Sequence, residues 1–118
     1  MSYDIALVHP ETEEVLELRE KHPFRGGTYV VGGTNSCEFN ITYNYAPHFV
    51  KVFGPKGIRT IYGMTGTQSL PLIRAAITAL GNDTDQDYWK STEGNARLAL
   101  LPLEFFASAY PHGKWKGD

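Results

Sequence analysis

Three aspartates at alternate positions, Asp83, Asp85 and Asp87, are the densest group of potential metal ligands in the chain. A calcium loop that begins in this way needs a glycine at its sixth position and a bidentate glutamate at its twelfth. Tyr88 and Gly94 occupy those two positions. The pattern therefore predicts a solvated acidic turn without a bound metal.

The histidines and the single cysteine do not form a recognisable catalytic or metal-binding pattern. The four histidines are His9, His22, His48 and His112, and no two of them are four residues apart. We interpret them as surface or turn residues. Cys37 can form neither an internal disulfide nor a thiolate cage, and we expect it half-buried near a strand start. We therefore predict no cofactor and no catalytic residue.

Glycine pairs flank Tyr29–Val31, as Gly26-Gly27-Thr28 before it and Gly32-Gly33-Thr34 after it. A phosphate-binding loop needs Gly-x4-Gly-Lys-Ser/Thr or Gly-x-Gly-x-x-Gly at the start of a helix, and neither occurs. The nucleophile elbow Gly-x-Ser-x-Gly is also missing. These glycines therefore indicate turns.

Arginine, tyrosine and tryptophan side chains without an evident core role are the remaining candidates for binding. These residue types dominate the hot spots of protein interfaces, and they also recognise phosphates and bases. The candidate ligand- or partner-binding residues are Arg25, Tyr43, Tyr45, Arg59, Tyr62, Thr65, Trp89 and Asn95. In the alternative interpretation, the tyrosines and tryptophans bury their rings and hydrogen-bond their polar tips.

The composition is that of a globular protein, with 118 residues of which 42% are hydrophobic and 20% charged. This length predicts a single domain over residues 1–118. The sequence has no apolar run that could span a bilayer and no secretory signal at its start, so we expect a cytoplasmic protein without a membrane partner. The net charge of -2 and the absence of clustered cations argue against a nucleic-acid partner.

The first half of the sequence predicts two β-hairpins. Tyr3–His9 and Val15–Arg19 alternate apolar and polar residues on either side of the polar turn Pro10–Glu14. Thr28–Val31 is β-branched and aromatic, and after a polar turn the run Phe39–Tyr43 has period-2 spacing. The pattern therefore predicts about four strands.

Two helices are predicted in the middle of the chain. Pro47 suits the first turn of a short helix that ends at Gly54-Pro55. The following residues, 57–63, fit either a strand or an ordered loop. A second helix ends at Gly81, and we favour Ser69 over Thr65 as its cap because this places Pro71 at the second helical position.

The last predicted helix is the longest and is apolar on nearly every side. Ser91 or Thr92 can cap it, it runs to about Tyr110, and Pro102 predicts a kink. Its two apolar stripes are Ala96, Ala99, Leu103, Phe106 and Tyr110, and Leu98, Leu101, Phe105 and Ala109. The second stripe should pack on the helix that ends at Leu80, or on another copy of the chain through residues 96–110. The sequence thus predicts an α+β fold with about three helices packed on the hairpins.

Three segments resemble those of small uncharacterised proteins encoded by bacteriophages and prophages. They are Phe39–Tyr45, Gly57–Gly66 and Tyr88–Ala96, and the closing Gly113–Asp118 also fits. This resemblance implies no established activity and no site residues. It places the expected site of action in the host cytoplasm.

The resemblance leads to a functional hypothesis, because small phage proteins without an enzyme signature are often accessory factors. The main expectation is an inhibitor of a host defence system that acts by protein–protein binding. The alternative is a sponge for a signal nucleotide, with Arg25, Arg59 and the aromatic residues forming a pocket. The last alternative is an enzyme with a noncanonical site built from Asp85, Asp87 and a histidine.

Overall fold

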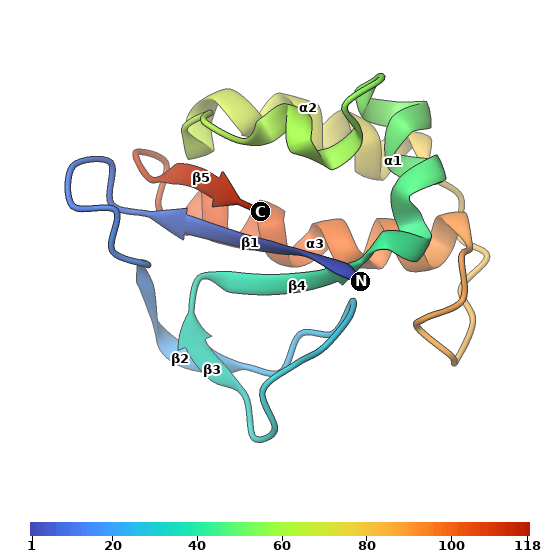
Figure 1. The fold of residues 1–118 in the computed structure, drawn as a ribbon, viewed down its shortest axis with the longest axis horizontal. Helices are drawn as coiled ribbons and strands as arrows, with labels where there is room; N and C mark the ends of the chain where they lie inside the picture. Colours follow the sequence, from blue (N-terminus) through green and yellow to red (C-terminus); the bar gives the residue numbers. More distant parts are fainter.

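The computed structural model describes residues 1–118 and has an α+β fold, with five antiparallel strands in two sheets (Figure 1). The strands are β1 (Ser2–Val8), β2 (Glu17–His22), β3 (Thr34–Ser36), β4 (Glu38–Thr42) and β5 (Lys114–Gly117). The helices are α1 (Ala46–Phe53), α2 (Gly66–Ala79) and α3 (Glu93–Ala109), with 3₁₀ helices η1 (Tyr43–Tyr45) and η2 (Gly57–Ile61). As predicted, the C-terminal helix α3 is the longest.

The main sheet has the strand order β4-β1-β5 and carries the core. Alternate residues of β1 are buried, and they lie in register with the neighbours Phe39 on β4 and Trp115 on β5. Figure 1 shows α2 and the β2–β3 ribbon on opposite sides of β1, with α3 behind the sheet. The core therefore forms between one face of this sheet and the helices.

Loop backbone pairs with both outer strands of the main sheet, with β4 only at its last residue. Thr42 N donates to Gly26 O at 2.8 Å along β4, and Trp115 N donates to Met64 O at 2.9 Å along β5. In contrast, β2 pairs only with β3, and even this pairing is irregular between Glu17 and His22. The free edge of β2 is thus an unpaired strand edge on the molecule.

The first predicted hairpin is wrong in its pairing. The two alternating segments do form β1 and β2, but they meet only at the bridge between Val8 and Val15. Strand β1 instead pairs with β4 and β5, which are distant in sequence. Alternation identified the strands, but their partners depend on the core that they share.

The second predicted hairpin is wrong in its first strand. Thr28–Val31 lies in the loop between β2 and β3, whereas the run from Phe39 belongs to β4 as predicted. The ambiguous segment 57–63 contains the 3₁₀ helix η2, and β5 was not predicted. Cys37 is fully buried, deeper than the half-buried position expected.

Helix α2 begins at the cap that the sequence analysis ranked second. The Thr65 hydroxyl accepts from Gln68 N at 3.1 Å, and Gln68 Oε1 accepts from Thr65 N at 3.0 Å, which completes a capping box. Pro71 consequently lies inside the helix. The expected cap, Ser69, is buried and serves the core instead, because its hydroxyl accepts from the indole of Trp115 at 2.7 Å.

Helix α3 is capped by Thr92, one of the two predicted residues, and its first apolar stripe is buried from Ala96 to Phe106. The second stripe does not pack on α2. Leu98 is 45% exposed and Phe105 is 49% exposed, although Arg74 on α2 reaches Glu104 on α3 at 3.3 Å. Within one chain, therefore, α3 is covered on one side only.

Candidate functional site

Three of the eight predicted binding residues, Tyr43, Arg59 and Tyr62, meet around Asp118, and we call these four residues with Tyr3 the Arg59 cluster. The Asp118 carboxylate accepts from Tyr43 Oη at 2.9 Å and from Tyr62 Oη at 3.0 Å. Arg59 lies 3.4 Å from the same carboxylate, with its guanidinium 4.9 Å from the centre of the Tyr3 ring. The cluster therefore joins β1, η1, η2 and the segment after β5.

The charges within the Arg59 cluster compensate one another. Desolvation raises the pKa of Asp118, but the hydrogen bonds from Tyr43 and Tyr62 and the charge of Arg59 outweigh it, so the pKa lies below its ordinary value. The hydrogen bond to Asp118 also raises the pKa of Tyr43. A phosphate would have to displace an internal carboxylate to reach Arg59. The cluster therefore links parts of the fold and does not offer an open anion-binding site.

Tyr45, Trp89 and Asn95 gather at the loop of residues 82–92, where two of them have structural roles. The buried Tyr45 hydroxyl donates to the Tyr88 carbonyl, and its pKa is raised to about 12, mainly by burial. The Asn95 amide binds three backbone groups of the loop, including Asp85 N at 3.0 Å. Trp89 alone presents an exposed ring at this place.

Each of the three alternate aspartates of this loop accepts a hydrogen bond from a backbone N–H. Asp83 accepts from Gly94 N, and Asp85 and Asp87 each accept from the backbone N–H two residues later. No group of three or more histidine, cysteine, aspartate or glutamate side chains converges as a metal site. The carboxylates of this loop therefore serve backbone hydrogen bonds of the loop itself and of the start of α3.

The last two predicted residues, Thr65 and Arg25, lie apart from the others. Thr65 is the cap of α2 described above. The Arg25 guanidinium stacks over the Tyr29 ring at 4.4 Å, in the loop of residues 23–33 that follows β2. The eight residues therefore do not form one site.

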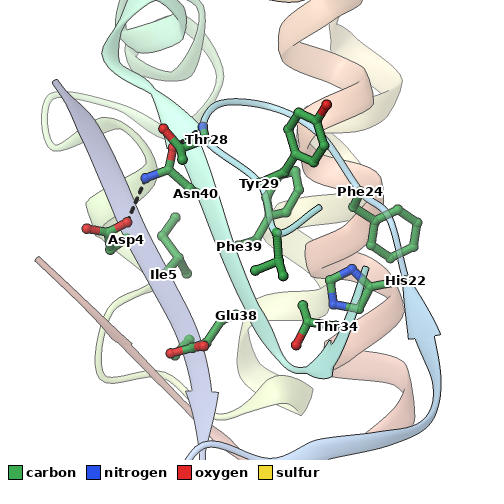
Figure 2. A pocket seen from close by; sticks show the side chains of 12 residues that line it. Asp4, Ile5, His22, Phe24, Thr28, Tyr29, Thr34, Glu38, Phe39 and Asn40 are labelled. Carbon is green, nitrogen blue, oxygen red and sulfur yellow. Dashed lines mark hydrogen bonds between the residues drawn. The ribbon is translucent and has the colours of Figure 1, made fainter. Parts of the chain in front are cut away.

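Two of the hollows in the structure were not indicated by the sequence, and the smaller of these two, about 350 Å³, we call the β4 pocket. Figure 2 shows it at the edge of β4, with Asp4, Glu38 and Asn40 on one side and His22 and Phe24 on the other. Tyr29, Val30 and Phe39 also line it. It is mixed in character, with carboxylates at one side and aromatic rings at the other.

The larger hollow, about 880 Å³, lies between β2 and the C-terminal half of α3, and we call it the β2–α3 groove. Its apolar wall includes Phe105 and Tyr110 on one side and Leu18 and Phe24 on the other. Charged side chains of β2 form its rim, namely Arg19, Glu20 and Lys21. Two residues of the second stripe of α3, Phe105 and Ala109, thus line the β2–α3 groove.

His22 was expected at the surface or in a turn, but it is buried at the end of β2, where it lines the β4 pocket. Asp118, which is central to the Arg59 cluster, was not among the predicted residues. Neither residue belongs to a spacing pattern, because their partners come from distant parts of the chain. Phe105, by contrast, was found through the stripe of α3.

Comparison with protein-family models, with curated proteins and with solved structures finds no match to this chain. No helix in the structure has the length and apolar character that crossing a membrane requires.

Proposed function

We propose that this protein is a small accessory binding protein that occupies a surface of a host protein, with the free edge of β2 and the second stripe of α3 as its binding face. The observation that carries this proposal is the pair Leu98 and Phe105, both nearly half exposed, of which Phe105 lines the β2–α3 groove. They lie seven residues, or two turns, apart on the same side of α3. Exposed apolar surface of this kind marks interaction sites when it is contiguous.

The composition of the face supports protein binding more than binding of a small anion. Its centre offers aromatic rings, Phe105 and Tyr110, and its rim offers both signs of charge, Arg19 and Glu20. Protein interfaces have this organisation, with an apolar centre enclosed by a polar rim. The unpaired edge of β2 adds backbone groups that an extended segment of a partner can pair with.

The biological setting in this proposal comes from the resemblance to phage and prophage proteins. A phage protein that covers a functional surface of a host defence component would block it, and the binding face would carry this inhibition in the host cytoplasm. The nucleotide-sponge alternative has less support, because Arg59 already holds Asp118. The enzyme alternative has less support as well, because Asp85 and Asp87 accept hydrogen bonds from their own turn.

The proposal is tested by plaque assays in bacterial cells that carry one defence system each and express this protein. Each strain is infected with a phage that its defence system restricts. We expect plating to be restored for at least one system, with no effect in cells lacking it. If the protein accumulates in the cells and no defence system is relieved, the inhibitor function is wrong.

A further inference from the structure

The β4 pocket lies outside the proposed binding stripe of α3 and contains a buried acceptor without a partner. His22 is 7% exposed, and its Nε2 lies 2.8 Å from the Ser36 carbonyl oxygen. Because a carbonyl only accepts, Nε2 carries the proton of the neutral ring, and Nδ1 presents a lone pair. Nδ1 is buried and has no hydrogen-bond partner. Buried polar atoms are rarely left in this state, so a missing partner is indicated.

The opposite side of the same pocket has two carboxylates, those of Asp4 and Glu38. Asp4 Oδ1 accepts from the Asn40 amide at 2.6 Å, and neither Asp4 nor Glu38 belongs to an ion pair. Asp4 is opposite Asn40 in the β1–β4 register, so Glu38 is its diagonal neighbour, roughly 7 to 8 Å away. A single ammonium group between them can reach both carboxylates.

The space between these two ends is bounded by rings. Phe24 stacks on the His22 imidazole with centroids 4.7 Å apart and an interplanar angle of 24°. Tyr29 and Phe39 also line the pocket, and Figure 2 shows both rings on the same side of β4 as the imidazole. The volume of about 350 Å³ is at the small end of ligand pockets, and its lining suits one flat apolar group.

We propose that the β4 pocket binds a small organic cation, with an ammonium group between Asp4 and Glu38 and a ring that donates an O–H or N–H to Nδ1 of His22. Nδ1 is closed off from solvent, so the ligand ring must displace a side chain that covers it. Val30 lines the pocket from a loop in which Val31 is 88% exposed and Gly32 has a φ of 86°. Val30 is itself 59% exposed, so moving its side chain removes little buried apolar contact.

The test uses three matched probes in NMR titrations of the ¹⁵N-labelled full chain. Tyramine carries an ammonium group and a phenol, phenethylamine lacks the hydroxyl, and 4-hydroxyphenylpropionate reverses the charge. We expect tyramine to bind most tightly, phenethylamine more weakly, and the carboxylate not at all. The amide shifts should be confined to β4, His22 and the loop of residues 23–33.

Two kinds of variant test the contributions of the two ends of the pocket to binding separately. Glu38→Gln and Asp4→Asn should each weaken tyramine binding at least about threefold, whereas Glu14→Gln, at an exposed position outside the pocket, should not change it. His22→Phe keeps an aromatic ring against Phe24 but removes Nδ1, so the preference for tyramine over phenethylamine should disappear.

The proposal would be overturned by the absence of localised shifts with either amine. It would equally be overturned if binding were unchanged by the removal of both carboxylates. Since Glu38 is exposed and has no partner in the fold, its variant tests the proposal even if His22→Phe fails to fold. Neither outcome depends on the inhibitor function.

Discussion

At the scale of single residues, Ser69 shows how one hydroxyl can hold two parts of the core. It accepts from Trp115 Nε1 at 2.7 Å and donates to the Gly66 carbonyl at 2.9 Å, in a fully buried position. Ser69→Ala leaves the indole N–H buried without an acceptor. We expect a loss of about 1–3 kcal/mol in the free energy of unfolding, measured by urea denaturation. Ser108→Ala on the exposed side of α3 should stay within about 0.5 kcal/mol of the natural chain.

Asp118 gives a pH-dependent prediction. Its pKa is lowered in the folded chain, so the ionised carboxylate stabilises the fold above the ordinary aspartate range near pH 4. This contribution is lost as the pH falls through the lowered value. Asp118→Asn should therefore reduce the unfolding free energy at pH 7 by no more than about 1 kcal/mol, because the site is partly exposed.

The measurement is a series of denaturation curves from pH 7 downward for the natural chain and Asp118→Asn. The difference between the two proteins should shrink as the acid end is approached. Tyr62→Phe, which removes one hydrogen bond to the carboxylate, should show part of the same pH-dependent difference. A difference that stays constant over the whole range would mean that the carboxylate charge does not stabilise the fold.

Residue types indicated some of the important side chains but not their partners. Tyr43, Arg59 and Tyr62 were selected for their chemistry, and they do meet. Asp118 completes the cluster from the far end of the chain, and no spacing in the sequence could show that contact. The same holds for His22, whose partner Ser36 lies on another strand.

At the scale of elements, the start of α2 depends on its capping box. Thr65→Ala removes the acceptor for Gln68 N and should reduce the unfolding free energy by about 1 kcal/mol. Thr78→Ala lies inside the same helix at an exposed position, where alanine is the better helix former. It should be neutral or slightly stabilising by urea denaturation. Equal losses in the two variants would argue against the cap.

Helical periodicity predicted the helices well, because each helix is stabilised by contacts near in sequence. The choice between Thr65 and Ser69 failed for a tertiary reason, since the core uses Ser69 for the indole of Trp115. The segment Thr28–Val31 has strand-forming residues but lies in the loop between β2 and β3, where Thr28 N donates to the Asn40 side chain and not to a strand backbone. Local propensity was overridden in both cases by contacts far along the chain.

At the scale of the whole molecule, the second stripe of α3 predicts the state of association. If a host protein is the partner of this stripe, the isolated protein should have a mass of 13.2 kDa across a concentration series in light scattering. A mass that doubles with concentration would indicate a dimer. If Leu98→Asp then restores the monomer, the second stripe is the contact between two copies of the chain. That result would contradict the assignment of the face to a host protein.

The fold class followed from the sequence, but the arrangement of strands did not. The order β4-β1-β5 joins the first strand to one in the middle of the chain and to one near Gly117. Hairpin reasoning favours neighbours in sequence, so it could not find these pairs. The exposed stripe was visible as a pattern, but only the fold shows that α2 leaves Leu98 and Phe105 uncovered.

The most direct test of the binding face is the plaque assay repeated with matched charge substitutions. Leu98→Asp and Phe105→Asp place a carboxylate on the face, whereas Leu72→Asp places one at an exposed leucine on α2. Circular dichroism and the melting temperature establish that each variant is folded. We predict that Leu98→Asp and Phe105→Asp abolish relief of the defence system and that Leu72→Asp retains it. Full relief by folded Leu98→Asp and Phe105→Asp would contradict the account.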